Sequence, residues 1–577
     1  MDIFAKTKLI PSNQVISPER NSVFNLKEFI SNNRKIFILL FFLVLITYFN
    51  STGNEFVSDD VGAIKTNPNI AYLEGVFSSP AGIIQRSLYF FDAFTFGLHP
   101  SVFRITSNLI FHIANTFLVF VLLNIISKRK PLAVFAACLF AIHPILTEAV
   151  VWISASPYVQ STFFALLSII TYILFKNAAN WKKYLPFILF LAALSCQQAM
   201  IVIPLLFVLY ELIFEKNGIR WKRLMPYLLV LAICITIFMP QAFQRRDGSI
   251  PESNGVIVKY YNPLIQIPIV ISSYFKLTIW PSALSFFPVE NMSYVHATGR
   301  QYALYLSFFI ILGIILWLSW KKNKSIFFWL SFFLISLIPT HLPIKTNWIL
   351  GERYVYFGSV GLFAIIACFF DWMLKMYPRH KNFIHIVFAT ILIAFSIRTI
   401  IRNRDWKNEL TLYIATQKTS PSGSLVYDEL GKAYCRQGDD EKAIEAFKKS
   451  IEINQYDPYP HYDIAMLYSK NGQPDLAFEE LKKTIALSPN SAPAYHYLAV
   501  LYEGRNEKDL AISGYMAAID KDPKFWKAYW NLGVLYYNAG DYQDALTSMQ
   551  KALETNSGST ELQGNLEIIK SRLNGRL

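Results

Sequence analysis

The chain has little cysteine for its length. Only five Cys occur in 577 residues. Four of them stand in apolar segments and the fifth is alone in a more polar region: Cys138, Cys196, Cys234, Cys368 and Cys435. This distribution offers no disulfide framework, so it excludes a disulfide-stapled fold and does not indicate a redox compartment.

Charge is also scarce, at 16% of residues, whereas hydrophobic residues make up 53% and aromatic residues 16%. These proportions exceed what one water-soluble core requires, and they predict a membrane protein. The formal net charge of +14 would suit a nucleic-acid partner, but most Lys and Arg before residue 401 stand in short clusters between apolar runs. Such clusters are a topology signal, so the expected partner is a lipid bilayer and not a nucleic acid.

Eleven apolar runs are candidates for membrane spans, because a long apolar segment satisfies its backbone in lipid only as a helix. They are residues 36–50, 102–126, 131–146, 158–175, 184–197, 199–214, 224–240, 302–320, 325–339, 356–374 and 383–400. Basic clusters occupy every second gap between them. The positive-inside rule then places residues 1–35 in the cytoplasm and everything after residue 401 outside, in a periplasm or an endoplasmic reticulum lumen.

Two segments test this scheme. Residues 264–281 are apolar enough to span, but counting them would break the alternation of basic gaps. We interpret them as an interfacial or re-entrant helix, in which Pro268, Lys276 and Pro281 are tolerated. The first apolar run lacks a small-residue cleavage site, which favours a retained anchor over a cleaved signal peptide.

From residue 424 the apolar density falls and a period of 34 residues appears. Small residues, tyrosines, alanines and bulky residues recur in phase: Gly431, Ala465, Ala499 and Gly533; Tyr434, Tyr468, Tyr502 and Tyr536; Ala443, Ala477, Ala511 and Ala545; Phe447, Leu481, Tyr515 and Met549. The pattern resembles the tetratricopeptide repeat (TPR), in which small residues let two helices approach and large ones fill the neighbouring hole. We predict a linker over 401–423, four repeats over 424–559 and a capping helix over 560–577, with Thr560 as a candidate N-cap.

The first helix of each repeat usually lines a concave groove. In this register it presents Tyr462, His496 and Trp530 at equivalent positions. An aromatic groove of mixed polarity suits an extended peptide or a glycan. The alternative is that these rings only pack within the array.

Polar side chains gather in the loops predicted to lie outside. They are Asp59 and Asp60 after the first span, Arg86 in the same loop, His143 and Glu148 at the third span, and Glu352 and Arg353 before the tenth. Paired carboxylates can serve as a general base or bind a divalent cation, and an arginine can bind a phosphate through two hydrogen bonds. The alternative for the acidic pair is a solvated loop or a helix cap.

The order of these motifs resembles the GT-C superfamily of polytopic glycosyltransferases, in particular the transmembrane and TPR O-mannosyltransferases and their bacterial relatives. Four motifs carry the resemblance: Asp59 and Asp60; NLIFH with Asn108 and His112; HPILTEAVVWI with His143, Pro144, Glu148 and Trp152; and GERYVYFGSVGL with Glu352, Arg353, Tyr354 and Tyr356. The resemblance implies an all-α, GT-C-like membrane bundle and a polyprenyl-phosphate sugar donor. It also implies that the acidic pair activates the acceptor hydroxyl and that Arg353, with Glu352, holds the donor phosphate. Arg86, His112, His143 and Glu148 would support them.

Charged residues that relatives commonly carry are missing at two places. Gln197 and Gln198 stand before the sixth span, and Pro157 and Tyr158 follow the Trp152 motif. These changes leave the donor open and make an inactive member an alternative.

Three functions are therefore compared. The first is an inverting glycosyltransferase that requires no cofactor, although its acidic pair is compatible with a divalent cation. The second is a membrane-anchored TPR scaffold for protein–protein interaction. The third, a transporter, is disfavoured because no charged residues stand mid-span in a pattern that suggests an ion pathway. Eleven spans exceed what an anchor needs, which favours the enzyme.

Overall fold

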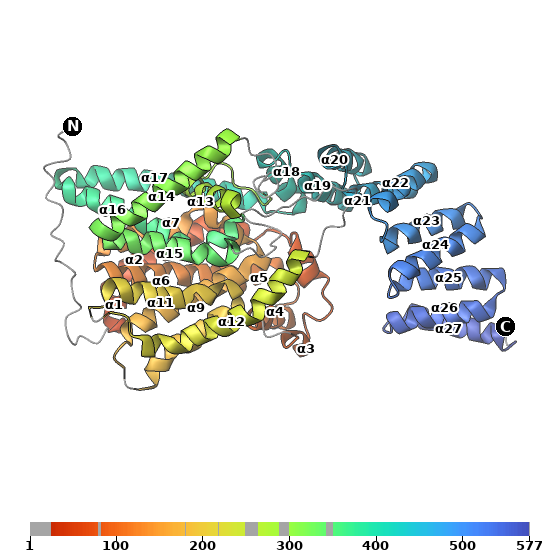
Figure 1. The fold of residues 1–577 in the computed structure, drawn as a ribbon, viewed down its shortest axis with the longest axis horizontal. Helices are drawn as coiled ribbons and strands as arrows, with labels where there is room; N and C mark the ends of the chain where they lie inside the picture. The colour runs from red at the N-terminus through yellow and green to blue at the C-terminus, as the bar shows by residue number, and fades with distance from the viewer. Residues whose placement is uncertain are drawn as a thin grey trace. The chain divides into compact units, whose positions relative to one another are not determined.

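The structure is a computed structural model that describes residues 25–78, 82–178, 180–216, 218–247, 263–287, 299–341 and 350–575. The regular elements of these residues are all helical (Figure 1). The described residues are divided between two compact units, with the boundary in the sequence between Pro421 and Ser422. The predicted cytoplasmic tail lies outside the described residues, except for residues 25–35.

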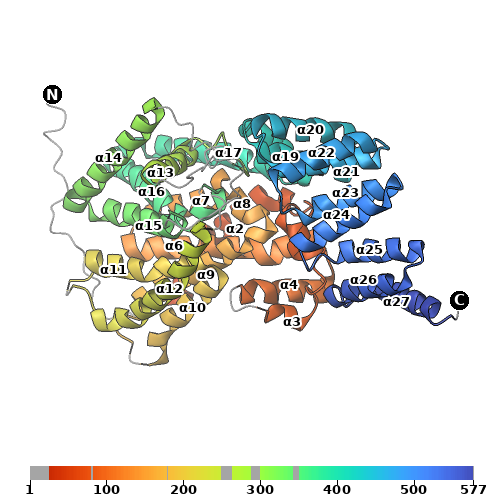
Figure 2. The same ribbon diagram turned by 45° about the vertical axis from the view of Figure 1, so that its right-hand side comes forward.

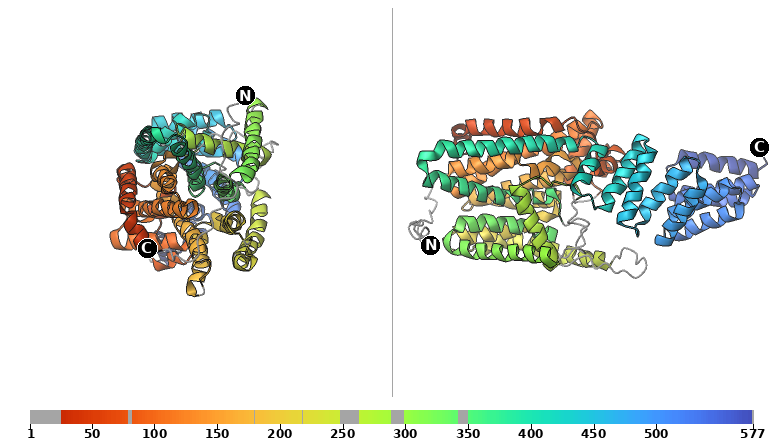
Figure 3. Two further views of the ribbon diagram at one scale, coloured as in Figure 1. Left: turned by 90° about the vertical axis from the view of Figure 1, so that its left-hand side faces the viewer. Right: turned by 90° about the horizontal axis from the view of Figure 1, so that it is seen from above.

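The first unit is a helical bundle. Its helices are α1 (Leu26–Asn32), α2 (Arg34–Tyr48), α3 (Leu73–Val76), α4 (Ile83–Phe96), α5 (Pro100–Arg104), α6 (Ile110–Ser127), α7 (Lys130–Ile142), α8 (Thr147–Val151), α9 (Ser156–Leu174), α10 (Leu185–Cys196), α11 (Ile203–Phe214), α12 (Trp221–Asp247), α13 (Pro263–Ile279), α14 (Gly299–Lys322), α15 (Lys324–His341), α16 (Ser359–Met376), α17 (Lys381–Asp405) and α18 (Glu409–Thr419). Several of the long helices run side by side along one direction (Figure 3).

Six helical segments in the described residues are long and apolar enough to cross a membrane: Arg34–Ser51, Pro100–Ser127, Ile153–Leu174, Tyr302–Lys322, Ser359–Met376 and Pro378–Asp405. A seventh candidate is the pair Lys130–Ile142 and Pro144–Val151, which bends by 53°. The chain is therefore a multi-pass membrane protein. The other four predicted spans fall on α10, α11, α12 and α15, and the count of eleven stays a prediction.

Two of the candidate spans, α14 and α17, expose large apolar side chains on their outer faces. Leu304 and Ile310 on α14, and Phe383 and Ile393 on α17, are all exposed. Large apolar side chains are exposed in this way when lipid and not water surrounds the helix. By contrast, α7 is buried, because it packs against α2, α6, α16 and α17.

Where α7 ends, regular helix gives way to a series of short turns over residues 143–155. They are the 3-10 turn Pro144–Leu146, α8, and the 3-10 turn Ile153–Ala155. His143 and Trp152 adopt extended backbone angles between these turns. The breaks place the polar residues of this segment inside the bundle.

The second unit consists of helical hairpins, as predicted. Its helices are α19 (Ser424–Gln437), α20 (Asp440–Ile453), α21 (Pro458–Lys470), α22 (Pro474–Leu487), α23 (Ala492–Gly504), α24 (Lys508–Lys521), α25 (Trp526–Ala539), α26 (Tyr542–Thr555) and α27 (Thr560–Leu573). The four first helices begin 34 residues apart, at Ser424, Pro458, Ala492 and Trp526. Helices α23 to α27 are stacked in sequence order (Figure 2).

The recurring residues form the core of this unit. All four phased alanines are 0% exposed, and the bulky residues that follow them are at most 2% exposed. A Cβ built on Gly431 would lie 2.5 Å from a ring carbon of Phe447. The absent side chain thus makes room for a ring, as the TPR pattern requires.

One detail differs from expectation. The N-cap of α27 is Ser559, whose side chain accepts a hydrogen bond from Leu562 N at 3.3 Å, so the expectation of Thr560 was wrong. The predicted linker over residues 401–423 contains the end of α17 and all of α18. Asn408 and Thr411 cap α18 reciprocally, which explains why a helix begins there.

Candidate active site

The acidic pair after α2 consists of one exposed and one buried carboxylate. Asp60 is 0% exposed, and its Oδ1 accepts hydrogen bonds from Ser154 N at 2.7 Å and Ser154 Oγ at 2.5 Å. Its Oδ2 accepts a third from Val57 N at 3.3 Å. Asp59 is exposed, and no donor from the described residues bonds to its carboxylate. Asp60 therefore fastens the first loop to Ser154, whereas Asp59 is exposed to solvent.

Arg104 is a residue of this site that the sequence interpretation missed. Its guanidinium is buried and donates to the carbonyl oxygens of Val151 at 2.7 Å, Asn54 at 2.8 Å and Glu55 at 3.0 Å. Burial raises the pKa of Asp60 to about 6, although the bonds from Ser154 and the charge of Arg104 favour its ionised form. A lone arginine inside a predicted span was the signal that could have identified it.

Arg353 is paired with Glu148. The guanidinium forms an ion pair with Glu148 Oε1, and the backbone N of Arg353 donates to Oε2 at 3.1 Å. Arg353 also donates to Tyr354 Oη at 3.2 Å and lies 5.1 Å from the centre of the Trp152 ring. Because Arg353 is bound to protein groups, its role at a donor phosphate remains a prediction.

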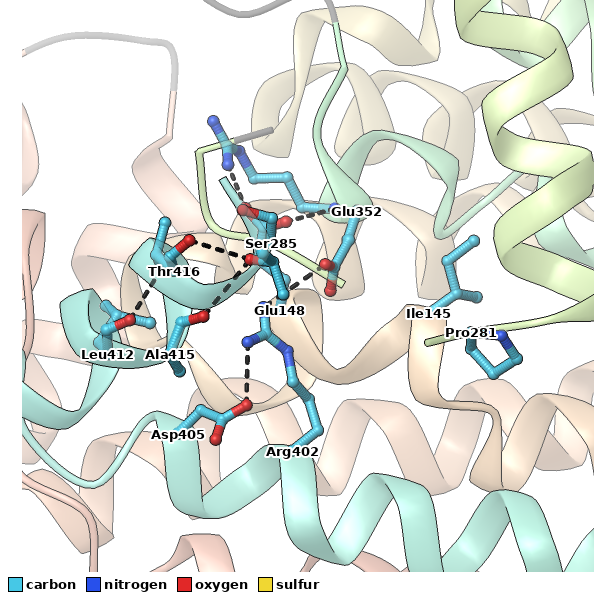
Figure 4. A network of polar contacts seen from close by, with 12 residues as sticks. Ile145, Glu148, Pro281, Ser285, Glu352, Arg402, Asp405, Leu412, Ala415 and Thr416 are labelled. Carbon is cyan, nitrogen blue, oxygen red and sulfur yellow. Dashed lines mark hydrogen bonds and ion pairs between the residues drawn. The ribbon is translucent and has the colours of Figure 1, made fainter. Parts of the chain in front are cut away.

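Glu352, the neighbouring residue, points toward α17 (Figure 4). Its Oε1 accepts a hydrogen bond from Arg402 at 3.4 Å, and Arg402 also donates to Asp405 Oδ2 at 3.1 Å. Burial raises the pKa of Glu352, because the loss of water around its carboxylate outweighs the opposing effect of the Arg402 charge. Its Oε2 has no hydrogen-bond partner among the described residues. Arg402 and Asp405 follow the last predicted span and were not anticipated.

The two predicted histidines are buried supports. The Ala141 carbonyl oxygen lies 3.3 Å from Nε2 of His112, so that nitrogen carries the proton and Nδ1 accepts from Tyr356 Oη at 2.7 Å. In His143, Nε2 donates to the Thr278 carbonyl oxygen at 2.9 Å and Nδ1 accepts from Ile145 N at 3.2 Å. Since both nitrogens of each ring are engaged, neither histidine is arranged to carry protons to a substrate.

Arg86 lies on α4 and donates from Nε to the Val76 carbonyl oxygen at 3.1 Å. It therefore fastens α4 to the end of α3. Among the described residues, no group of three or more His, Cys, Asp or Glu side chains could hold a metal ion. For a divalent cation, with which the acidic pair is compatible, the described residues offer no preformed group of this kind.

Several of these residues form one continuous region. Ser154, which binds Asp60, is two residues from Trp152, and the Trp152 ring lies against Arg353 and 5.3 Å from the Phe286 ring. Segments distant in the sequence thus meet around Trp152. Arg86 and His143 bind elsewhere in the bundle.

In the repeats, His496 is buried and its Nε2 lies 3.0 Å from Asn531 Nδ2. Tyr462 packs edge-on against Tyr497, with ring centres 5.6 Å apart. Trp530 stacks on Trp526, with ring centres 5.7 Å apart. These rings pack against neighbours within the array, and acceptor binding by them stays a prediction.

Family models match the repeat part of the chain. A "TPR repeat" model matches residues 431–472, and "Tetratricopeptide repeat" models match residues 460–491 and 526–559. A solved structure, "Crystal structure of MamA", is 28% identical with a TM-score of 0.24 and covers 26% of this chain and 86% of that chain.

The chain is also a distant homologue of curated proteins. It is 23% identical over 502 residues to the human "Protein O-mannosyl-transferase TMTC3", covering 75% of this chain and 53% of that protein. It is 22% identical over 449 residues to the Caenorhabditis elegans "Protein O-mannosyl-transferase F38B6.6", covering 72% of this chain and 62% of that protein. The predicted resemblance is confirmed. The chain spans little more than half the length of the curated relatives it matches.

Proposed function

We propose that this chain is a membrane glycosyltransferase that moves a mannose from a polyprenyl-phosphate donor to a hydroxyl group of a protein. The observation that carries the proposal is the extent of the similarity. An alignment of 502 residues covering 75% of the chain is much longer than the repeats, so it includes a large part of the membrane unit. A scaffold that shared only its repeats with the relatives would not match in this way.

Asp59 is the general base in this proposal. Its carboxylate takes the proton from the acceptor hydroxyl while the hydroxyl oxygen bonds to C1 of the sugar. The bond between C1 and the phosphate oxygen breaks, and polyprenyl phosphate leaves with the electron pair. Asp60 is a positioning residue, because its oxygens are bound to Ser154 and Val57.

The reaction takes place on the non-cytoplasmic side, which the alternating basic clusters support. The repeats recruit the protein acceptor, since TPR arrays present extended surfaces for polypeptides. Under the alternative, a scaffold without catalysis, the repeats would bind the same partner and no sugar would be transferred.

The test is transfer by the purified full chain in liposomes, with polyprenyl-phosphate mannose and a serine- and threonine-rich peptide. Asp59→Asn keeps the size of the side chain and removes its basicity, so transfer should fall by at least about a hundredfold. Glu74→Gln removes an exposed carboxylate from the same loop and should leave transfer unchanged. Equal transfer by the wild type and Asp59→Asn would favour the scaffold.

A further inference from the structure

A small cavity lies beside Glu352. It is lined by Ser273 and Lys276 of α13, by Ser285 after that helix, and by Leu350 and Glu352. The two walls are joined where Tyr274 Oη donates to the Gly351 carbonyl oxygen at 3.0 Å. The cavity is therefore part of the packed bundle and adjoins the region around Trp152 through Phe286, the neighbour of Ser285.

The lining of this cavity is largely apolar, with Leu277 and Ala283 beside Leu350, and a few polar side chains reach it. Lys276 is exposed and makes no ion pair with the described residues. Ser285 Oγ lies 2.9 Å from Ser420 Oγ, so one hydroxyl can accept from the other and keep its own proton for a ligand. The unpartnered Oε2 of Glu352 is a third polar group here. Burial raises the pKa of Glu352, whereas the charge of Arg402 lowers it.

An ammonium and two serine hydroxyls together suit an anion with several oxygen atoms, such as a phosphate. Arg353 is less available for this task, because Glu148 neutralises it. Beside the cavity, Ile279 and Trp280 are both 70% exposed. Trp280 N donates to the Lys276 carbonyl oxygen at 2.7 Å, so these apolar side chains follow Lys276 by one helical turn. A cation beside an apolar surface fits an amphiphile better than a free ion.

We propose that this cavity holds the phosphate of the polyprenyl-phosphate donor, with Lys276 as its charge partner, Ser273 and Ser285 as hydroxyl donors, and the polyprenyl chain leaving over Ile279 and Trp280. This assignment places the donor phosphate at α13, whereas the resemblance implied a site at Arg353. It rests on the proposed function, which supplies the class of donor.

The experiment measures binding of farnesyl phosphate to the full chain in detergent, with farnesol and inorganic phosphate as comparison probes. Lys276→Gln should weaken farnesyl phosphate binding at least tenfold, and Lys276→Arg should restore most of it, because the charge returns. Lys381→Gln, which removes an exposed lysine at the start of α17, should bind as the wild type does. Farnesol should bind weakly to all variants.

Three results would overturn the assignment: unchanged farnesyl phosphate binding in Lys276→Gln, equal binding of farnesol and farnesyl phosphate, or inorganic phosphate bound as tightly as the lipid. The last would indicate a site for free phosphate. Binding needs no transfer, so the two proposals can fail separately. Lys276-dependent binding without transfer would reject only the proposed function, and transfer with an unchanged donor KM in Lys276→Gln would reject only this assignment.

Discussion

The buried pair of Glu148 and Arg353 gives a quantitative prediction about the membrane unit. Glu148 is 0% exposed and the Arg353 side chain 11% exposed. Removing one member of a buried pair leaves the other charge uncompensated, at a cost of about 3 to 5 kcal/mol. Arg353 keeps its bond to Tyr354 in the Glu148→Gln variant, so we expect the lower end, about 3 kcal/mol. Arg353→Gln should cost a similar amount.

The double variant is the sharper test, because it removes both charges. If the two side chains stabilise each other by about 2 kcal/mol, the double variant should lose about 4 kcal/mol and not the sum of about 6. At about 2 °C per kcal/mol, the melting temperature of the full chain in detergent should fall by about 6 °C in each single variant and about 8 °C in the double. Glu74→Gln should melt as the wild type does. Additive losses would refute the pairing.

Three further predictions concern the repeats and their placement. Burial raises the pKa of Asp463 to about 7, so the folded state loses stability as pH rises from about 4 through 7. Asp463→Asn should therefore slow hydrogen exchange in α21 at pH 8, because the free energy of opening rises by about 1 to 2 kcal/mol once solvent screening is allowed for. At pH 4 the same variant should change exchange little. Hydrogen exchange also tests the packing of Gly431. Gly431→Ala should destabilise the first repeat by about 1 to 3 kcal/mol, because the added Cβ would lie 2.5 Å from Phe447. Gly533→Ala is the control: its Cβ would lie 3.3 Å from the nearest atom, so it should be near neutral. A cysteine placed by Glu445→Cys on the exposed face of α20 should react with an impermeant maleimide added outside, and reaction from the cytoplasmic face alone would reverse the topology.

The repeat unit was largely predictable because its constraint is local. Each hairpin packs on the next, so the same small and large residues must recur every 34 residues, and Ala443 and Phe447 are buried where that period puts them. The N-cap was missed because Ser559 and Thr560 are adjacent and chemically alike; backbone angles decide between them, and the sequence does not show those angles.

The site was less predictable because its contacts join residues far apart in the sequence. In the sequence, Asp59 and Asp60 are indistinguishable neighbours. Only the fold shows that Ser154 donates hydrogen bonds to Asp60. Arg353 was predicted at a phosphate since its chemistry suits one, but an arginine suits a carboxylate equally, and Glu148 is close enough to bind it. The bend at His143, inside the predicted span 131–146, was not anticipated, because composition alone does not reveal a bend.

The most direct test of the account follows the sugar itself. The full chain in liposomes is given polyprenyl-phosphate mannose and a serine- and threonine-rich peptide, and the peptide is examined by mass spectrometry. The account predicts that the wild type adds a hexose to a hydroxyl side chain and that Asp59→Asn does not, while both proteins melt at the same temperature. A peptide that remains unmodified with the wild type, or is modified equally by Asp59→Asn, would contradict it.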